Sequence, residues 1–329
     1  MSYENTALEL AKDSVEKERE VASNPCTAGE LLAKLADSED AKIRQLVAGN
    51  PNTPMEVLFK LGVEFPEEFL NNPILGLLLL EDPNLAVKIP LPTLRSIILK
   101  CDNVPVSFME WGAGHFDEGI KVALAQNCKT PASVLEKLAD HQNYEVRWYV
   151  AQHPNTPASV LEKLASDKTL VYNRPIVIRV AVANNPNTPA KVLEKLAETQ
   201  EVYNLIEIGR NIREAVAQNP NTPEKVLEKL AEDKEVVVRR AVSLNANITE
   251  NLVVRLTLDR KRGEKLNENA AISSDLLEKL AAHVEAKVRA IVALHPNTPK
   301  RILKQLAKDK SESVRQAVAS NVETPKEIL

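Results

Sequence analysis

One short phrase recurs along this chain and limits what it can fold into. Asn-Pro-Asn-Thr-Pro is followed shortly by Val-Leu-x-x-Leu-Ala, and most successive copies begin 26 residues apart. A fixed period of this length is typical of a solenoid, in which each repeat is one supersecondary unit. Clear copies begin at Asn50, His153, Asn185, Asn219 and His295, and degenerate copies begin at Asn24, Cys101, Asn127, Asn245, Asn269 and Asn321.

The copy at Asn219 shows what one unit should contain. We expect Thr222 to cap a helix whose first residue is Pro223, because proline is well tolerated in a first turn. The apolar residues that follow fall on one stripe at 3.6 residues per turn. A second stripe lies on the helix that leads into the next turn phrase. The first stripe is Val226, Leu227, Leu230 and Ala231, and the second is Val238, Ala241 and Val242.

A pair of helices this short cannot bury its own stripes, so only a stack of such pairs can fold. The sequence therefore predicts an all-α solenoid of about ten two-helix repeats of about 26 residues. Residues 1–23 should form a capping segment, because Lys17 and Glu20 stand where better copies have apolar residues. Residues 24–329 should form the array, with an irregular elaboration at 62–100 and longer repeats at 153–184 and 185–218.

Composition restricts the class of protein further. The chain has 329 residues, of which 44% are hydrophobic and only 4% aromatic, which suits thin layers of Leu, Val and Ala. Its longest apolar run, residues 74–80, is shorter than the roughly 18 residues that span a bilayer. The net charge of −4 provides no general attraction to nucleic acid. We expect a cytoplasmic protein whose three cysteines, Cys26, Cys101 and Cys128, are free thiols.

The unit resembles the leucine-rich repeat variant family of bacteria. That family's pattern of Val-Arg-x-x-Val-Ala, Asn-Pro-x-Thr-Pro and Leu-x-x-Leu-Ala is matched by residues 146–165, with His153 in place of the turn asparagine. The resemblance implies a right-handed superhelix of alternating α- and 3₁₀-like helices, similar to HEAT and armadillo arrays. The resemblance implies no enzyme. It would imply an iron–sulfur cluster only if the chain had a cysteine-rich N-terminal segment, but Cys26 is the only cysteine near that end, so we expect no cofactor.

The repeat departs from itself in three places, and function in solenoids is often found at such places. Two insertions share Val-Tyr-Asn and would display Tyr172 and Tyr203 on one edge. In the unit before them, Trp148 takes a position that is variable and mainly polar in other copies, and it lies between Tyr144 and Tyr149. These rings either fill space beneath the insertions or form a protein-binding hot spot, where Trp, Tyr and Arg are enriched.

The third departure, residues 62–100, keeps Asp82-Pro83-Asn84 as an echo of the turn phrase but loses the regular spacing. It predicts either a bend that re-aims the stack or a lobe that binds a partner.

A row of arginines holds one register, six residues before each turn asparagine or its substitute. Stacking would align these cations along a groove that could bind phosphates or an acidic peptide. Alternatively, each arginine clamps a carbonyl at a helix end, or an acidic residue of the next unit. The row is Arg44, Arg147, Arg179, Arg213, Arg239, Arg289 and Arg315, with Lys121 standing in once.

The turn asparagines form a second row, which should satisfy backbone groups of the turns. An alternative, by analogy with armadillo arrays, is that they hold the backbone of an extended peptide. The row is Asn24, Asn50, Asn127, Asn185, Asn219, Asn245 and Asn269.

No recognisable catalytic motif occurs, and the loop around His115 and Asp117 matches no metal-site spacing. We therefore predict a non-catalytic scaffold, without metal or cofactor, that binds a protein or peptide through its concave face and an aromatic edge of repeats 127–218. The alternative is nucleic-acid binding along the arginine row; no membrane partner is expected. The predicted partner-binding residues are Trp148, Tyr144, Tyr172, Tyr203, Arg147, Arg179, Arg213 and Arg239.

Overall fold

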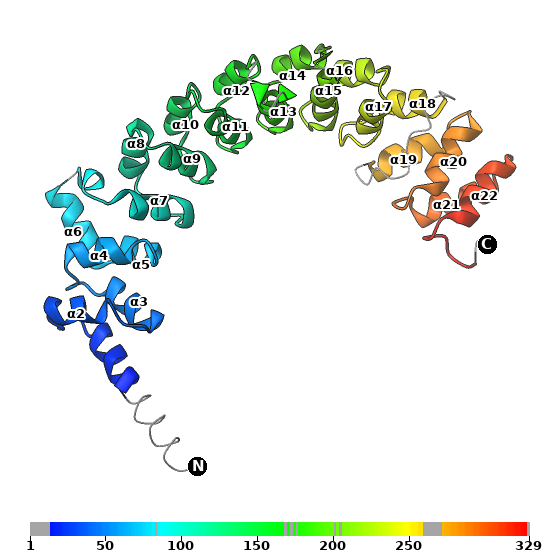
Figure 1. The fold of residues 1–329 in the computed structure, drawn as a ribbon. Coiled ribbons are helices and arrows are strands. Elements are labelled where there is room, and N and C mark those ends of the chain that lie inside the picture. The colour runs from blue at the N-terminus through cyan, green and yellow to red at the C-terminus, as the bar shows by residue number, and fades with distance from the viewer. Residues whose placement is uncertain are drawn as a thin grey trace. The chain divides into compact units, whose positions relative to one another are not determined.

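The fold is taken from a computed structural model that describes residues 14–82, 84–167, 170–171, 174–175, 177–200, 202–203, 206–258 and 272–327. Contacts within the chain divide it into two compact units, Met1–Asn155 and Thr156–Leu329. Each unit is a two-layered stack of short helices (Figure 1).

The first unit begins with helical residues 14–23, in which Lys17 and Glu20 are exposed as expected. Helices α3, α5, α7, α9 and α11 pack one after another in one layer, while α2, α4, α6, α8 and α10 lie on its other side (Figure 1). The elements are α2 (Gly29–Leu35), α3 (Ala41–Gly49), α4 (Met55–Leu61), α5 (Pro66–Asn71), α6 (Pro73–Glu81), η1 (Leu85–Val87), α7 (Leu91–Lys100), α8 (Val106–Gly114), α9 (Glu118–Gln126), α10 (Ala132–Leu138) and α11 (Tyr144–Gln152).

The second unit repeats this arrangement. Helix α15 packs between α13 and α17, α14 packs beside α16, and further along the chain α20 packs on α22. Its helices are α12 (Ala158–Leu164), α13 (Val177–Asn184), α14 (Ala190–Ala197), α15 (Ile208–Gln218), α16 (Glu224–Leu230), α17 (Val236–Ser243), α18 (Glu250–Leu258), α19 (Ser274–Ala281), α20 (Ala286–Leu294), α21 (Lys300–Leu306) and α22 (Glu312–Ser320). The expected solenoid of two-helix repeats is thus confirmed within each unit.

The two insertions add short antiparallel ladders to an otherwise helical chain. Strand β1 (Leu170–Val171) pairs with β2 (Arg174–Pro175) between α12 and α13. Strand β3 (Val202–Tyr203) pairs with β4 (Ile206–Glu207) between α14 and α15. Both insertions therefore enter the same kind of connection, as predicted. In the described residues both helices of a repeat are α-helices, and a 3₁₀-helix is found only at η1, so the expected alternation of the two helix types is wrong.

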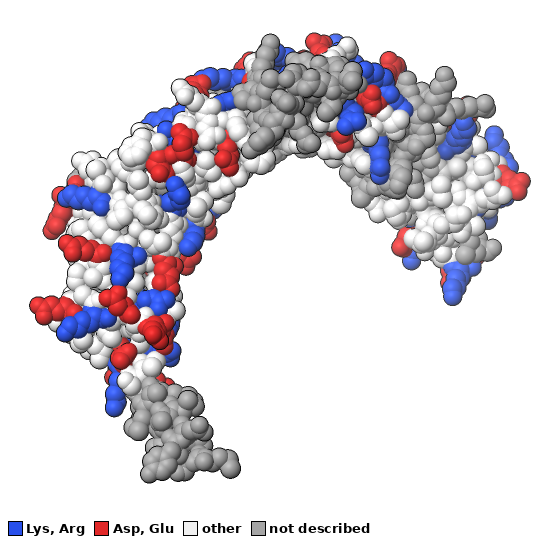
Figure 2. All heavy atoms as spheres, viewed as in Figure 1, with Lys and Arg blue, Asp and Glu red and all other residues white. Residues whose placement is uncertain are grey.

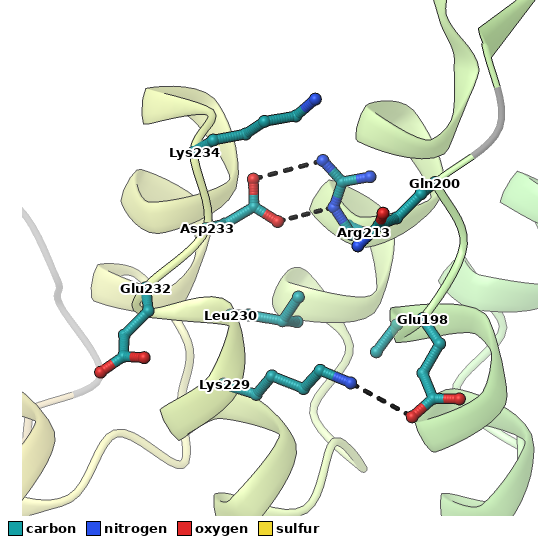
Figure 3. A pocket seen from close by; sticks show the side chains of 9 residues that line it. Glu198, Gln200, Arg213, Lys229, Leu230, Glu232, Asp233 and Lys234 are labelled. Carbon is teal, nitrogen blue, oxygen red and sulfur yellow. Dashed lines mark hydrogen bonds and ion pairs between the residues drawn. The ribbon is translucent and has the colours of Figure 1, made fainter.

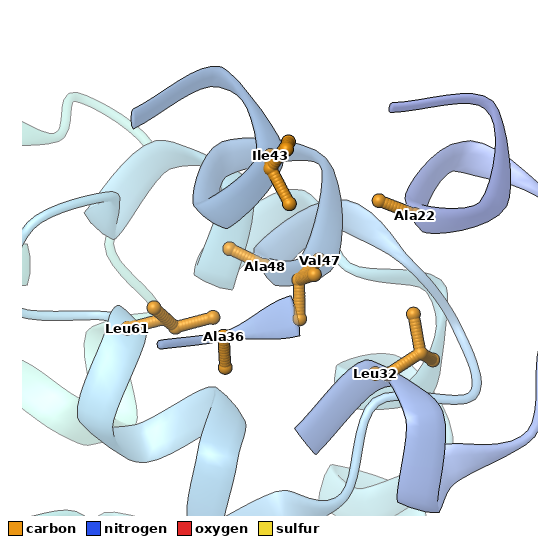
Figure 4. Packing of buried hydrophobic residues seen from close by; sticks show 7 residues of the cluster. All are labelled: Ala22, Leu32, Ala36, Ile43, Val47, Ala48 and Leu61. Carbon is orange, nitrogen blue, oxygen red and sulfur yellow. The ribbon is translucent and has the colours of Figure 1, made fainter. Parts of the chain in front are cut away.

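The apolar stripes form the core. In the repeat at Asn219, Leu227 and Val242 are completely buried and Leu230 is 2% exposed. At the start of the array a cluster joins the first helices into one core (Figure 4). Its members are Ala22, Leu32, Ala36, Ile43, Val47, Ala48 and Leu61.

Thr222 does not cap the helix that follows it. Helix α16 begins at Glu224, and its N-cap Pro223 makes no side-chain hydrogen bond. The hydroxyl of Thr222 instead donates to the carbonyl of Val216, at 2.5 Å, and so closes the last turn of the preceding helix. Thr53, Thr130, Thr188 and Thr298 make the same bond to a carbonyl six residues earlier.

Residues 62–100 contain a regular turn that the sequence analysis missed. Asn72, followed by Pro73, occupies the register of the turn asparagine, only 22 residues after Asn50. The echo at Asp82 follows the end of α6 and keeps one bond of the turn, because the N–H of Asn84 donates to Oδ1 of Asp82 at 2.9 Å; Asp82 also pairs with Lys88 at 2.8 Å. A Cβ atom at Gly62 would lie 2.7 Å from Cγ2 of Thr93, so glycine lets α7 approach the end of α4.

In the described part of the chain no helix is both long and apolar enough to cross a bilayer.

Candidate functional site

The turn asparagines bond to two repeats at once. The Nδ2 atom of Asn219 donates to the carbonyls of Ala183 and Asn185 in the preceding repeat, at 2.7 and 2.9 Å. Its Oδ1 atom accepts from the N–H of Asn221 in its own turn, at 2.8 Å. The side chain is 2% exposed, so it cannot also hold a peptide backbone. The interpretation that these residues satisfy turn backbone groups is confirmed and extended across the repeat boundary.

The same pair of bonds to the preceding repeat recurs at several other turn asparagines. Asn245 reaches Ala217 and Asn219, and Asn72, which the sequence analysis omitted, reaches Ala48 and Asn50. Asn50, Asn127 and Asn321 do likewise. Asn269 lies outside the described residues.

We call this row of turn side chains, each bonded to the preceding repeat, the ladder. Histidine can replace asparagine in the ladder because its ring also presents a donor and an acceptor. The Nε2 atom of His153 lies 2.7 Å from the carbonyl of Asn127, and its Nδ1 atom accepts from the N–H of Asn155 at 3.0 Å. Both contacts are satisfied only by the neutral ring with its proton on Nε2. The ring is 4% exposed, and burial lowers the pKa of His153, although the bond to Asn127 opposes this shift.

The arginine row forms clamps between neighbouring repeats. Nε and Nη2 of Arg213 lie 2.6 and 3.2 Å from the two carboxylate oxygens of Asp233, and Nη1 donates to the carbonyl of Thr199 at 2.8 Å. Arg239 lies on α17, the helix that packs beside α15, and donates to the carbonyls of Asp233 and Lys234 at 2.7 and 3.0 Å. The turn at Asp233 is therefore held by an arginine on each side.

An identical clamp closes the C-terminal repeats. Arg289 makes a bidentate pair with Asp309 at 2.7 and 2.8 Å, and Arg315 donates to the carbonyl of Asp309 at 2.8 Å. The hydrogen bond from Arg289 lowers the pKa of Asp309, although burial of the carboxylate opposes this shift. In the first unit Arg44 plays this part with Glu64 and with the carbonyls of Ser38 and Glu39.

Lys121 stands in the register of the arginines, and its partner also differs from the usual carboxylate. Its Nζ atom lies 3.0 Å from Nε2 of His141, which holds the register of Asp233. Burial and the nearby charge of Lys121 lower the pKa of His141, whereas Glu118, 3.3 Å from the same nitrogen, raises it.

These contacts give the predicted partner-binding arginines partners within the chain. Contact with a partner requires exposed guanidinium groups, but Arg179, Arg213 and Arg239 are 5%, 4% and 6% exposed. Arg147 is half-buried, and its Nη1 atom donates to the carbonyls of His141 and Gln142. The alternative interpretation, that the row stitches repeats together, agrees with the bonds of Arg213, Arg239 and Arg147.

Helix α11 brings together the aromatic residues predicted near position 148. Tyr144, Trp148 and Tyr149 are all half-buried, and the ring centroids of Trp148 and Tyr149 are 4.8 Å apart at an angle of 55°. Tyr144 and Trp148 are four residues apart and so share one helix face. Tyr172 lies outside the described residues and only the strand of Tyr203 is described, so their edge stays a prediction.

A polar pocket of about 390 Å³ lies at the longer connection of the second unit (Figure 3). Its charged side chains are largely paired with each other: Lys229 lies 3.1 Å from Glu198, and Arg213 holds Asp233. Small-molecule pockets are mostly apolar with a few convergent polar groups, which this pocket is not. Its lining is Ala197, Glu198, Gln200, Arg213, Lys229, Leu230, Glu232, Asp233 and Lys234.

The loop around His115 uses its ligand-capable groups internally. Nδ1 of His115 accepts from the N–H of Asp117 at 3.0 Å, and the ring stacks against Trp111 and Phe116 at centroid distances of 4.7 and 4.2 Å. The Asp117 carboxylate accepts from the backbone of α9 and from Arg95. The part of the chain that the structure describes contains no group of three His, Cys, Asp or Glu side chains placed to hold a metal ion.

The cysteines are free, as predicted. Cys26 and Cys128 are exposed, whereas Cys101 is buried, and burial raises its pKa to about 11.

Comparison with known families identifies the repeat. The model of the leucine rich repeat variant matches residues 210–235, which contain the clamp residues Arg213 and Asp233 and the ladder residue Asn219. The chain contains a leucine-rich repeat variant. The resemblance expected from the sequence is thereby confirmed over this one repeat, residues 210–235.

Two solved structures are similar to this chain at low identity. One, described as a leucine-rich repeat variant with a novel repetitive structural motif, is 20% identical, covers 86% of this chain and 87% of its own, and has a TM-score of 0.38. The other is an engineered protein, 16% identical, with coverage of 96% and 95% and a TM-score of 0.33. Likenesses at this level add nothing to the fold derived above. No curated protein matches the sequence.

Proposed function

We propose that this leucine-rich repeat variant protein is a non-catalytic scaffold that binds a protein or peptide partner through the aromatic surface of α11, formed by Tyr144, Trp148 and Tyr149. Stacked helical repeats in general provide extended surfaces for interaction. The finer assignment to α11 is argued from its side chains.

The concentration of rings on α11 carries the proposal. Only 4% of the chain is aromatic, yet three rings lie within six consecutive residues of one helix and remain partly open to solvent. Trp and Tyr combine a large apolar area with a polar atom, and they dominate the binding energy of protein interfaces. The corresponding register is mainly polar in other repeats, which hold Gln45, Glu214, Arg240 and Gln316, although others have Val180 and Ala290. Tyr172 and Tyr203 stay predictions from the sequence.

A protein partner is favoured over nucleic acid because the cations best placed to track phosphates are used within the stack. Arg213 and Arg239 are buried against the turn at Asp233. On the visible face of the first unit, acidic and basic side chains are interleaved and form no basic stripe (Figure 2). A phosphate-binding groove requires an uncompensated row of cations.

The test compares Trp148→Ala with Gln316→Ala, which alters the same register position in another repeat. Both variants of the full chain are used as bait in affinity capture from lysate of the source cell, followed by mass spectrometry. We expect Trp148→Ala to lose partners that the wild type and Gln316→Ala retain, and the captured partner to bind the purified variant at least about tenfold more weakly. An unchanged set of partners for Trp148→Ala would contradict the proposal, provided that its circular dichroism melting curve matches the wild type.

A further inference from the structure

Helix α6 presents an apolar face to solvent. Its exposed residues are spaced at i, i+3, i+4, i+7 and i+8, which places them on one side of the helix. Leu77 is 58% exposed and Leu80 is 82% exposed. Val87, on the adjoining η1, is also 58% exposed. The exposed face of α6 consists of Pro73, Gly76, Leu77, Leu80 and Glu81.

This face differs from the solvent side of the regular second helices. In α16 the exposed side chains include Glu224, Lys225 and Lys229, so the solvent side of that helix is charged. Residues 70–94, in contrast, contain only three charged side chains, and two of them, Asp82 and Lys88, form an ion pair at 2.8 Å. Contiguous apolar groups on the surface of a protein commonly mark an interaction site. The remaining charge, Glu81, stands at the C-terminal end of the face.

The form of the face indicates what could cover it. A Cβ built on Gly76 meets no atom within 4 Å, so the backbone between Pro73 and Leu77 is open to close approach. From Pro73 to Glu81 the helix is about 12 Å long, which offers two turns of anchor positions to a second helix. The exposed carboxylate of Glu81 and the C-terminal end of the helix dipole both favour a cation at that end.

We propose that the exposed face of α6 binds a short amphipathic helix of a partner protein, which has leucine-type anchors and a Lys or Arg that pairs with Glu81. A second copy of this chain fits less well, because two leucines and Val87 bury far less than the roughly 800 Å² per partner of a standard interface. The surface is separate from the aromatic surface of α11, so either proposal can fail without the other.

The experiment measures fluorescence anisotropy of a labelled peptide of about 18 residues, or five helical turns, with Leu on one face and Lys on the other. A peptide of the same composition in scrambled order is the control for charge. The full chain is compared with the double variant Leu77→Glu/Leu80→Glu and with Leu99→Glu, because Leu99 is 47% exposed on α7 of the same unit. The altered side chains are exposed, so melting curves should agree among the three proteins.

We expect the wild type and Leu99→Glu to bind the amphipathic peptide with similar affinity, and the double variant to bind it at least about tenfold more weakly. Equal affinity of the double variant, or equal binding of the scrambled peptide, overturns the proposal. Light scattering that shows a dimer which the double variant loses would assign the face to a second copy instead. Binding to phosphatidylcholine vesicles that the double variant loses would assign it to a lipid surface, and either result overturns the proposal.

Discussion

At the scale of the residue, the asparagines and histidine of the turn register each present one side chain that both donates and accepts at fixed points. Asparagine does this with an amide and histidine with a neutral ring, as Asn219 and His153 show. A sequence predicts a turn asparagine readily, but the donor bond to a carbonyl of the preceding repeat depends on how two repeats stack. For the same reason the role of Thr222 was mistaken: a local rule suggests an N-cap, whereas the folded turn places the Val216 carbonyl closer.

We expect Asn219→Ala to lower the free energy of unfolding by about 2–3 kcal/mol, because it leaves two buried carbonyls and the Asn221 N–H without their partner. Asn219→His should cost less, since His153 in the same register contacts one carbonyl of the preceding repeat and accepts from its own turn. Urea unfolding followed by circular dichroism measures both variants. A histidine variant no more stable than the alanine variant would show that the pair of bonds does not define the position.

His153 makes part of the stability depend on pH. Because burial lowers the pKa of the folded ring below its usual 6.5, the unfolded chain binds the proton more tightly. The contribution of His153 is therefore complete above pH 6.5 and is lost as the pH falls through the lowered pKa. Melting temperatures between pH 7.5 and 5 should fall less for His153→Asn than for the wild type, and His283→Asn, at a half-buried turn position, is the control. Parallel curves for the wild type and His153→Asn would contradict this assignment.

At the scale of the element, the turns at Asp233 and Asp309 are each held by two arginines, one from each of the two neighbouring helices that flank the turn. The sequence predicted the register of the arginines and offered a structural interpretation, since a clamp suits nearly every copy. The sequence alone could not decide between the clamp and a binding groove. The direction of an arginine side chain depends on whether a carboxylate of the neighbouring repeat lies within its reach. Helix α5 was missed for a related reason: its turn, Asn72-Pro73, follows the previous one after 22 residues and lacks the rest of the phrase.

We expect Arg213→Ala to lower the free energy of unfolding by about 3–5 kcal/mol, because it leaves the Asp233 carboxylate, 8% exposed, without its partner. Adding Asp233→Asn should restore part of the loss, since a neutral amide is cheaper to bury than an unpaired charge. Arg301→Ala, which breaks the exposed pair with Glu278, is the matched control and should change little. If Arg213→Ala behaves like Arg301→Ala, then the clamp does not hold the turn together.

At the scale of the whole molecule, the arrangement of charge bears on the two classes of partner predicted from the sequence. From the sequence alone, a row of arginines in one register could form a phosphate-binding groove. The structure shows which groups accept hydrogen bonds from these arginines. The acceptors are carboxylates and carbonyls of the same chain, as Arg213, Arg289 and Arg44 show. The net charge of −4 adds no compensating attraction.

We therefore expect no measurable binding of a labelled DNA duplex of about 20 base pairs at about 50 mM salt, the condition under which electrostatic binding is strongest. Fluorescence anisotropy with the full chain at micromolar concentration provides the measurement. Binding that weakens steeply as salt increases would require several phosphates to be neutralised, at a slope of roughly 0.9 per phosphate in a log–log plot. If Arg240→Ala, which removes an exposed cation of α17, then reduced that slope by about one, the cations of this layer would contact nucleic acid and the protein-binding proposal would give way.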